Sequence, residues 1–207
     1  MHIVIAGNIG SGKTTLTQLL AHHYGWRARM ESVTHNPYLE DYYKDMRRWA
    51  LNLEVFFLKE RFRDLLTINR SKRTIVQDRS IYEGVYIFAA NNHDLGNMSD
   101  RDFETYMGLF ESMMMVAREP DLMVYLRASV PHLVENIQKR GRAYEQDMQL
   151  SYLKQLNDRY DRFMTEQYHG RAITIDVDNL DFLNRREDFE YIIARIDEQL
   201  SPHPTLL

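Results

Sequence analysis

The sequence contains no cysteine among its 207 residues. This absence excludes disulfides, thiolate zinc sites, iron–sulfur clusters and cysteine nucleophiles. Long apolar runs are also missing: the longest are short segments such as residues 122–126, whereas a membrane span needs roughly 20 residues. The chain enters a strand-like run directly after Met1, without a basic segment or a cleavable apolar segment. We therefore expect a cytoplasmic protein that does not associate with membranes.

An excess of basic residues is missing too. Lysine and arginine total 26 against 30 aspartate and glutamate residues, which gives a formal net charge of −4. Proteins that bind duplex nucleic acid usually carry a broad basic face. We therefore expect no nucleic-acid partner, although this balance is compatible with a local basic pocket.

The chain also lacks internal repeats, low-complexity tracts and Gly/Ser-rich linkers. Hydrophobic residues make up 44% and charged residues 27%, the balance of an ordinary globular protein. We expect residues 1–200 to form a single domain. Residues 201–207 contain two prolines and are expected to form a flexible tail.

Short β-branched runs alternate with longer stretches of helical periodicity. Strands are expected at residues 2–6, 29–33, 74–78, 121–127 and 172–177. Helices are expected at residues 13–24, 39–69, 82–118 with an interruption near 91–99, 131–140, 151–168 and 186–199. This alternation implies right-handed crossovers between parallel strands. The sequence therefore predicts an α/β fold, with a five-stranded parallel sheet flanked by helices on both faces.

A glycine-rich segment follows the first expected strand and opens a helix. Residues 7–14, GNIGSGKT, match the phosphate-loop (P-loop) pattern G-x-x-x-x-G-K-[ST]. In such a loop, backbone N–H groups and the helix N-terminus bind phosphate oxygens. Lys13 is expected to bridge the β- and γ-phosphates, and Thr14 to ligate Mg²⁺. The loop residues expected to bind ATP are Gly7, Asn8, Ile9, Gly10, Ser11, Gly12, Lys13, Thr14 and Thr15.

A carboxylate follows the second expected strand on the same side of the sheet. Ligands of open parallel sheets bind outside the carboxyl ends of the strands, so Glu31 is expected near the triphosphate. An alcohol acceptor must lose a proton as it attacks phosphorus, and a carboxylate can take that proton. A nucleoside-monophosphate kinase has no such need. Glu31 therefore favours phosphorylation of a hydroxyl group, although an ordinary solvated glutamate is the alternative.

The third expected strand ends in Asp78-Arg79-Ser80. There Asp78 can hold Mg²⁺, directly or through water, and Arg79 can neutralise charge on the transferred phosphoryl group. The guanine-reading motifs of regulatory GTPases are absent, and a mechanical ATPase usually has two acids at this strand end. These features leave a compact phosphotransferase as the main class.

Five segments together resemble the deoxynucleoside kinase family, including the bacterial deoxyadenosine and deoxyguanosine kinases. They are GNIGSGKTT (7–15), ESVTHNPYLEDYYKD (31–45), WALNLEVFFLKERF (49–62), QDRSIYEG (77–84) and KRGRAYE (139–145). The resemblance implies a P-loop kinase fold with a short lid, usually assembled as a homodimer. It also implies transfer of the γ-phosphate of ATP to the 5′-hydroxyl of a deoxynucleoside, with Mg²⁺ as cofactor.

The resemblance also implies roles for individual residues. Glu31 is similar to the general base of the family, and Arg79 to the residue that holds the 5′-hydroxyl and the phosphoryl group. Tyr43 and Glu145 are similar to the pair that grips the sugar 3′-hydroxyl, although core packing is the alternative for Tyr43. In the lid, the resemblance assigns Arg140 and Arg142 to the ATP phosphates, and a solvated basic cluster is the alternative. The segment Asp176 to Phe182 resembles the loop that brackets the adenine of ATP.

The expected base contacts lie on the third of these segments and beyond. Many relatives have glutamine at the position of Glu54, whereas an ionised glutamate offers only acceptors. Guanine presents two adjacent donors, while adenine would require protonated Glu54. Arg61 lies two helical turns along the same face and could donate to guanine, and Phe88 is expected to stack on the base. This favours deoxyguanosine, then deoxyadenosine; a helix-surface pair is the alternative for Glu54 and Arg61.

Two other functions remain open at this stage. One is a nucleoside-monophosphate kinase of the thymidylate kinase type, and the other is a non-catalytic ATP-binding module. Glu31, Tyr43 and the segment Asp78-Arg79-Ser80 argue against the monophosphate kinase. The joint presence of Lys13, Thr14, Glu31, Asp78 and Arg79 argues against the non-catalytic module. The function predicted from the sequence is that of a deoxynucleoside kinase in nucleotide salvage.

Overall fold

Strand β1 (His2–Gly7) lies at the centre of a five-stranded sheet. Its neighbours are β3 (Ile75–Asp78) and β4 (Leu122–Arg127), while β2 (Arg27–Arg29) and β5 (Ala172–Asp176) form the edges. Every pairing is parallel, in the order β2-β3-β1-β4-β5. The predicted α/β fold with five parallel strands is therefore confirmed.

The structure is a computed structural model that describes residues 1–31, 36–142 and 149–201. Glu145 and all of the expected tail except Ser201 lie outside these residues. Within the described residues, no helix has the length and apolar character required to cross a membrane.

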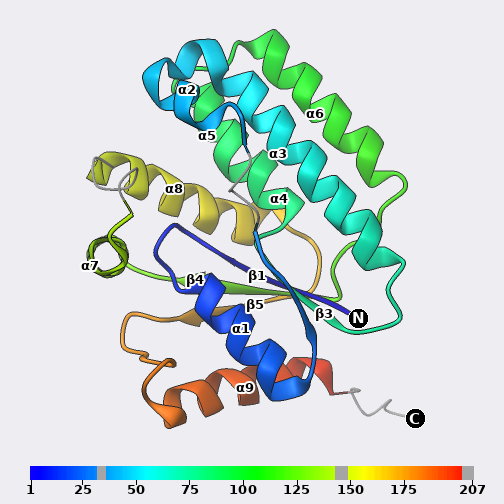
Figure 1. Ribbon diagram of the computed structural model, residues 1–207, viewed down its shortest axis with the longest axis vertical. Coiled ribbons are helices and arrows are strands. Elements are labelled where there is room, and N and C mark those ends of the chain that lie inside the picture. The colour runs from blue at the N-terminus through cyan, green and yellow to red at the C-terminus, as the bar shows by residue number, and fades with distance from the viewer. Residues whose placement is uncertain (32–35, 143–148, 202–207) are drawn as a thin grey trace.

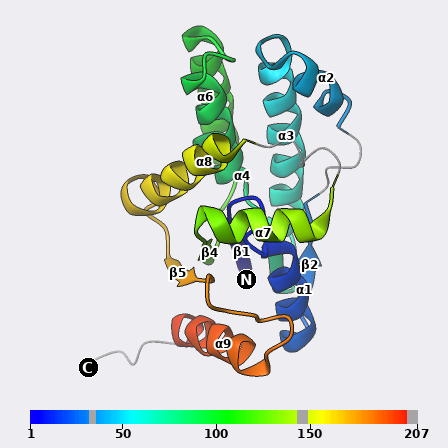
Figure 2. The same cartoon turned by 90° about the vertical axis from the view of Figure 1, so that its left-hand side faces the viewer.

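Helices cover both faces of the sheet (Figures 1 and 2). On one face lie α1 (Lys13–Tyr24) and α9 (Arg186–Leu200). On the other lie α3 (Met46–Asn69), α6 (Asp100–Met114) and α8 (Leu150–Arg162). The two layers bury separate hydrophobic clusters, so apolar side chains are needed on both sides of every central strand.

The alternation of side chains along β1 explains why its sequence is apolar throughout. Ile3 and Ile5 pack into the cluster with α1 and α9, whereas Val4 and Ala6 pack into the cluster on the opposite face. All four side chains are fully buried. The strand therefore reads as a continuous apolar run and ends at the first glycine of the phosphate loop.

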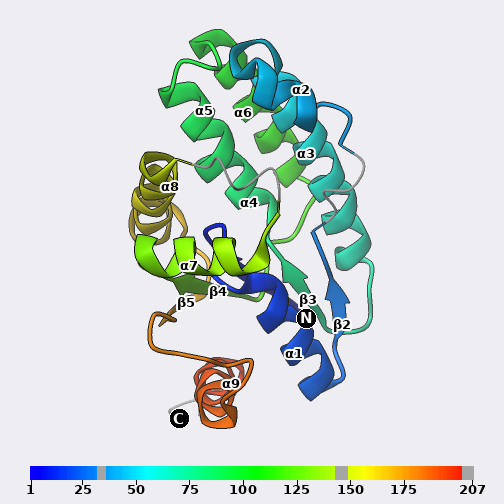
Figure 3. The same cartoon turned by 60° about the vertical axis from the view of Figure 1, so that its left-hand side comes forward.

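Strand β2 lies beside β3 at one edge of the sheet (Figure 3), and it begins and ends earlier than the sequence indicates. It spans Arg27–Arg29 instead of residues 29–33, and it pairs with β3 alone. This short edge strand carries two arginines, so its composition gives no apolar signal, and the backbone pairing Ala28↔Val76 sets its register. Glu31 consequently lies two residues beyond the strand end.

The helical pattern over residues 39–69 is two helices rather than one. Helix α2 (Leu39–Lys44) ends at Asp45, whose backbone leaves the helical region with φ −149° and ψ 84°. The Asp45 side chain then accepts a hydrogen bond from the Arg48 N–H at 3.0 Å and caps α3. An aspartate in this role competes with a continuous helix, since it satisfies an N-terminal donor of the next one.

The helical region expected over residues 82–118 is interrupted within the predicted range of 91–99. Helix α4 (Ile81–Glu83) continues into a π-helical segment, η1 (Gly84–Ala89), and then into α5 (Ala90–Asp94). Helix α6 begins only after Ser99, which caps it by accepting from the Asp102 N–H. Likewise α8 ends in a π-helical segment at Phe163–Gln167. The π-helical turns at Gly84–Ala89 and Phe163–Gln167 continue the neighbouring helices, so the sequence pattern there reads as helix.

Candidate active site

The phosphate loop joins β1 to α1 at the carboxyl edge of the sheet. Gly10 and Gly12 have φ values of 87° and 89°, which strongly favour glycine. A Cβ atom on Gly10 would lie 2.7 Å from the Leu133 carbonyl oxygen of α7 (Val130–Arg140), and one on Gly12 would lie 2.7 Å from the Phe182 ring. The glycine spacing of the motif therefore follows from both backbone conformation and close packing.

Two polar residues hold this loop in shape. Lys13 is buried, and its Nζ donates to the Asn8 carbonyl oxygen at 2.8 Å. Burial lowers the pKa of Lys13 to about 8, with the Arg79 charge acting in the same direction. The Asn8 amide donates to the Leu153 carbonyl oxygen and to Asn157 Oδ1, which ties the loop to α8. A desolvated ammonium group on a rigid loop can bind an incoming phosphate strongly.

Thr14 and Asp78 form the site expected to hold a metal ion. The Thr14 hydroxyl donates to Asp78 Oδ2 at 2.6 Å, while Asp78 Oδ1 is buried without a hydrogen-bond partner. Hydroxyl and carboxylate oxygens suit Mg²⁺, which keeps several waters and phosphate oxygens in its shell. No cluster of three or more His, Cys, Asp or Glu that could hold a metal occurs among the described residues. The pair thus fits a triphosphate-bound Mg²⁺ with few protein ligands.

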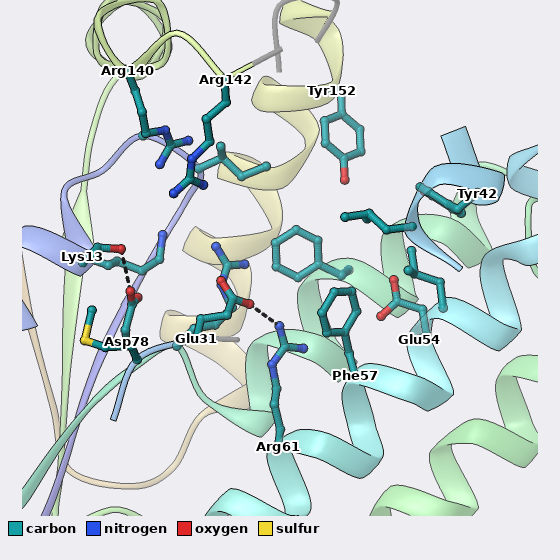
Figure 4. A pocket seen from close by; sticks show the side chains of 18 of the residues that line it. Lys13, Glu31, Tyr42, Glu54, Phe57, Arg61, Asp78, Arg140, Arg142 and Tyr152 are labelled. Atoms are coloured by element: carbon teal, nitrogen blue, oxygen red, sulfur yellow. Dashed lines mark hydrogen bonds and ion pairs between the residues drawn. The ribbon is translucent and has the colours of Figure 1, made fainter. Parts of the chain in front are cut away.

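Glu31 lies between two buried arginines (Figure 4). Its Oε1 accepts a hydrogen bond from Arg61 Nη2 at 2.7 Å, and its Oε2 lies 3.2 Å from Arg79 Nε. Burial alone would raise the pKa of Glu31, but the charges of Arg79 and Arg61 outweigh burial and lower it to about 2. Glu31 is therefore ionised at neutral pH in the free site.

Arg79 has an unusual backbone conformation. Its φ of 67° makes it the one non-glycine residue with positive φ in the described parts of the chain. Its N–H donates to the Ile5 carbonyl oxygen at 3.0 Å, and its guanidinium lies 4.6 Å from the centre of the Phe88 ring. Such conformations cost about 1–3 kcal/mol and are maintained by surrounding structure.

The buried carboxylate of Glu83 supplies part of that surrounding structure. It accepts from the Ser80 N–H at 2.7 Å, from the Gly7 N–H at 3.3 Å and from the Tyr160 hydroxyl at 2.8 Å. Glu83 thus connects the start of the phosphate loop with the bend that carries Arg79. The sequence marks Ser80 and Glu83 as a capping box at the start of a helix. The contact of Glu83 with the phosphate loop depends on tertiary structure and has no local sequence pattern.

A cavity of about 420 Å³ extends from the phosphate loop toward α2, α3 and α8 (Figure 4). Lys13, Glu31 and Asp78 line one end, and Glu54 and Tyr152 line the other. Its further lining residues include Ile9, Thr14, Tyr42, Tyr43, Leu53, Phe57, Arg61, Arg79, Phe88, Arg140 and Arg142. The cavity therefore joins the general-base candidate to a partly aromatic chamber large enough for a nucleoside.

Glu54 is buried at the aromatic end. Its Oε1 accepts from the Asn92 amide at 3.0 Å, while Oε2 has no hydrogen-bond partner. Burial raises the pKa of Glu54 to about 7, although Arg61 acts in the opposite direction. Because Glu54 and Arg61 are 3% and 8% exposed, the alternative of a helix-surface pair is wrong.

A second cavity, about 730 Å³, lies on the other side of the phosphate loop. It is lined by loop residues up to Thr15, by one side of α7 and by the segment from Asp178 to Arg185. Asn136 of α7 donates to the Gly10 carbonyl oxygen at 2.9 Å. The expected adenine loop, residues 176–182, thus overlaps the wall of this cavity, which continues three residues further.

The family model described as "Deoxynucleoside kinase" matches residues 3–201. The chain belongs to the deoxynucleoside kinase family. The enzyme is accordingly an ATP-dependent phosphotransferase. This finding agrees with a phosphate loop and a half-buried carboxylate, Glu31, that line one end of the same cavity.

Curated relatives and solved structures support the same assignment to the kinase family. A deoxyadenosine/deoxycytidine kinase of Bacillus subtilis is 38% identical over 196 residues, covering 94% of this chain and 90% of the relative. A deoxyguanosine kinase of Lactobacillus johnsonii is 36% identical over 210 residues, covering 96% and 92%. The solved structure of a deoxyadenosine kinase from M. mycoides with bound dATP has a TM-score of 0.83 at 29% identity, covering 95% of this chain and 100% of that one.

The remaining predicted residues of the kinase lie mostly around the same cavity. Tyr43 lines it with 46% of its surface exposed, while Tyr42 is the buried member of the pair. Arg140 and Arg142 extend toward Lys13 and line both cavities (Figure 4). Glu145 lies outside the described residues, so its expected contact with the sugar stays a prediction.

Sequence reasoning missed several residues of the kinase site. Asn92 joins Glu54 to Tyr42, whose hydroxyl donates to Asn92 Oδ1 at 2.7 Å. No local pattern marks an asparagine within a helix as a partner of a residue 38 positions earlier. Arg61 was expected to contact the base, but it also pairs with Glu31, which the i, i+7 spacing from Glu54 does not reveal.

Proposed function

We propose that this kinase transfers the γ-phosphate of ATP to the 5′-hydroxyl of a purine deoxynucleoside in nucleotide salvage, and that it prefers deoxyguanosine to deoxyadenosine. The observation that carries the proposal is the single cavity joining Lys13 and Glu31 to the buried Glu54. The relatives are named as kinases of deoxyadenosine, deoxycytidine or deoxyguanosine, so the choice of base rests on Glu54.

In this proposal the phosphate loop and Lys13 bind the β- and γ-phosphates of ATP. Arg140 and Arg142 close over the phosphates as a short lid and help to exclude water. Thr14 and Asp78 would hold Mg²⁺, which supplies neutralisation of charge on the phosphates. The unpartnered Asp78 Oδ1 supports this assignment.

Glu31 takes the proton of the 5′-hydroxyl as the oxygen attacks phosphorus. The two arginines that lower its pKa also make it a weak base in the free site. The γ-phosphate competes for the Arg79 guanidinium, and each interaction lost by Glu31 raises its basicity. Arg79 thereby moves its charge to the phosphoryl group, where negative charge must be stabilised.

The rest of the cavity orients the nucleoside. Tyr43 and Glu145 bind the sugar 3′-hydroxyl, since a phenol can donate and a carboxylate can accept. Phe88 stacks on the base, and the ionised Glu54 accepts from the N1–H and the amino group of guanine. Arg61 donates to a guanine acceptor through Nη1, which is buried without a partner.

We also propose that the kinase is a cytoplasmic homodimer. The family resemblance supports this assembly, and Leu109, Met115 and Val116 leave apolar surface exposed along and just after α6. Sedimentation equilibrium at micromolar concentration tests the assembly. A single species of 24.7 kDa would contradict it.

One assay tests the proposed reaction against its alternatives. ADP release is measured with the four deoxynucleosides, then with their monophosphates, then with no acceptor, and the product is compared with authentic 5′-monophosphates. We expect turnover with deoxynucleosides only, with deoxyguanosine first. Turnover with monophosphates alone would favour a nucleoside-monophosphate kinase, and ATP binding without turnover would favour a non-catalytic module.

The variant Glu31→Gln tests the general base. We expect ATP to bind at least as tightly, because Arg79 no longer pairs with a charged Glu31, while turnover at saturation falls about 10²-fold or more, the usual contribution of a general base. Glu104→Gln, on the exposed side of α6, is the matched control and should behave as wild type. Near-normal turnover by Glu31→Gln would exclude it as the base.

A further inference from the structure

Asn92 is a buried amide whose orientation is determined by its partners. Its Oδ1 accepts from the Tyr42 hydroxyl at 2.7 Å and from the Asn97 amide at 3.2 Å. Two donors on the oxygen leave the NH₂ group as the side directed at Glu54 Oε1, 3.0 Å away. Glu54 therefore always receives a hydrogen bond on one oxygen, whatever its protonation state.

The second carboxyl oxygen of Glu54 has no such partner. Oε2 is buried and unbonded, and Glu54 lines the nucleoside cavity. Because Asn92 can only donate to Oε1, the proton of neutral Glu54 belongs on Oε2. A protonated Oε2 donates and suits the N1 acceptor of adenine, whereas an ionised Oε2 accepts and suits the N1–H of guanine.

We propose that Asn92 is a positioning residue that sets the protonation of Glu54, and that the base preference of the kinase therefore reverses with pH. Ionised Glu54 selects deoxyguanosine, and protonated Glu54 selects deoxyadenosine. This inference rests on the proposed function, because it assigns Glu54 to the base.

The groups around Glu54 leave it as the main variable charge near neutrality. The charges of Arg61 on the same helix and of Arg79 at the end of β3 both act on Glu54, and burial raises the pKa of Tyr106 on α6. Burial likewise raises the pKa of Tyr42 on α2 and of Tyr152 on α8, so these phenols stay neutral. Burial raises the pKa of Glu54 itself to about 7, within the range in which enzymes are assayed.

The hydrogen bond from Asn92 acts against this burial. It stabilises the charged form of Glu54 more than the neutral form, and so lowers its pKa. Because the neutral carboxyl keeps a weaker form of this bond, only the difference between the two bonds shifts the pKa, and this difference corresponds to roughly one pH unit. Removal of Asn92 should therefore extend the range in which Glu54 is protonated.

The ratio of kcat/KM for deoxyguanosine to that for deoxyadenosine, measured from pH 6 to pH 8, tests the inference. The effects of pH on ATP and on the charges of Lys13 and Glu31 are the same for both deoxynucleosides, so they cancel in the ratio. We expect the ratio to rise with pH by up to about tenfold per unit, because the ratio of ionised to protonated Glu54 changes tenfold. Glu54→Gln should give a ratio independent of pH.

Asn92→Ala should shift the curve of this ratio against pH by about one unit toward higher pH. Tyr42→Phe keeps the shape of the side chain and removes the hydrogen bond from its hydroxyl to Asn92 Oδ1. This variant should shift the curve in the same direction by a smaller amount. It therefore tests the inference even if Asn92→Ala does not fold. His93→Gln controls for the neighbouring histidine, which pairs with Asp100, and should leave the curve unchanged.

Three outcomes would overturn the inference. One is a flat ratio in a wild-type enzyme that phosphorylates deoxynucleosides, which would leave the proposed function intact. Another is a pH-dependent ratio that persists in Glu54→Gln. The third is no phosphorylation of any deoxynucleoside, which would overturn the proposed function as well.

Discussion

Arg61 connects the catalytic end of the cavity with its aromatic end. Its Nη2 donates a hydrogen bond to Glu31, and its guanidinium lies 5.1 Å from the centre of the Phe57 ring. A Cβ atom on Gly84 would lie only 2.5 Å from its Nη1. The absence of a side chain at Gly84 therefore provides the space that this guanidinium occupies.

Gly84→Ala should disturb the nucleoside site without unfolding the protein, because the clashing atom is the end of a flexible side chain. We expect KM for the deoxynucleoside to rise about tenfold, as for the loss of one charge-assisted hydrogen bond. Gly108→Ala is the matched control, because a Cβ there meets no atom within 4 Å. It should keep KM and gain about 0.5–1 kcal/mol in the free energy of unfolding. Equal KM values for the two variants would contradict this role of Gly84.

Individual site residues differed in how far sequence could predict them. The phosphate loop is a local pattern in which the glycines, Lys13 and Thr14 follow from one turn of backbone. The shared face of Glu54 and Arg61 follows from helical periodicity, and both are buried in one cavity. The contacts of Arg61 with Glu31 and of Glu54 with Asn92 join separate elements, so no local spacing indicates them.

Helix α2 carries Tyr42 and Tyr43, and its position depends on the junction with α3. At that junction Asp45 both ends α2 and caps α3. Loss of the cap removes an acceptor from the first turn of α3 and frees the backbone between the two helices. The junction therefore links helix stability to the shape of the nucleoside cavity.

Asp45→Ala should lower the free energy of unfolding by about 1 kcal/mol, as typical for an N-cap, and also raise KM for the deoxynucleoside. Ser99→Ala removes the equivalent cap of α6 and is the matched control. It should cost similar stability and leave KM unchanged. Urea unfolding and steady-state kinetics measure both quantities. If both variants change KM equally, the junction has no specific role in substrate binding.

The elements themselves were largely predictable because most carry a strong periodic pattern. Strands β1 and β4 are largely apolar on both faces, and β3 begins with Ile75 and Val76. The predicted bounds of these three strands differ from the observed ones by one residue at most. An error occurred where the pattern is continuous but the helix is not, as at Asp45. The segment Gly84–Ala89 is helical as expected, but its π-helical turns have no mark in the sequence. Edge strand β2 was misplaced because its register depends on β3 instead of on its own apolar residues.

At the scale of the whole molecule, two glutamates that line one cavity should affect stability in opposite ways. Glu54 has a folded-state pKa of about 7, above the ordinary value of 4.5, so its ionisation destabilises the fold as pH rises between these values. Glu31 has a folded-state pKa of about 2, so its charge stabilises the fold above pH 4.5, and that contribution is lost as pH falls toward 2.

Glu54→Gln should therefore be more stable than wild type at pH 8, by an amount on the order of 3 kcal/mol at most, and the difference should shrink to less than about 1 kcal/mol at pH 5. Glu31→Gln, the opposite case in the same cavity, should be less stable than wild type at pH 8. Unfolding in urea at each pH measures both differences. A Glu54→Gln advantage that does not change with pH would contradict the raised pKa.

The central position of β1 has a consequence for how the chain is made. Ile3 pairs with Val76 on one side and with Leu122 on the other. On the ribosome, β1 emerges before both of its neighbours, and its β4 edge stays open until Leu122 has been synthesised. An apolar strand with an open edge is prone to pair with other chains. The nascent kinase is therefore most exposed to such pairing before β4 emerges.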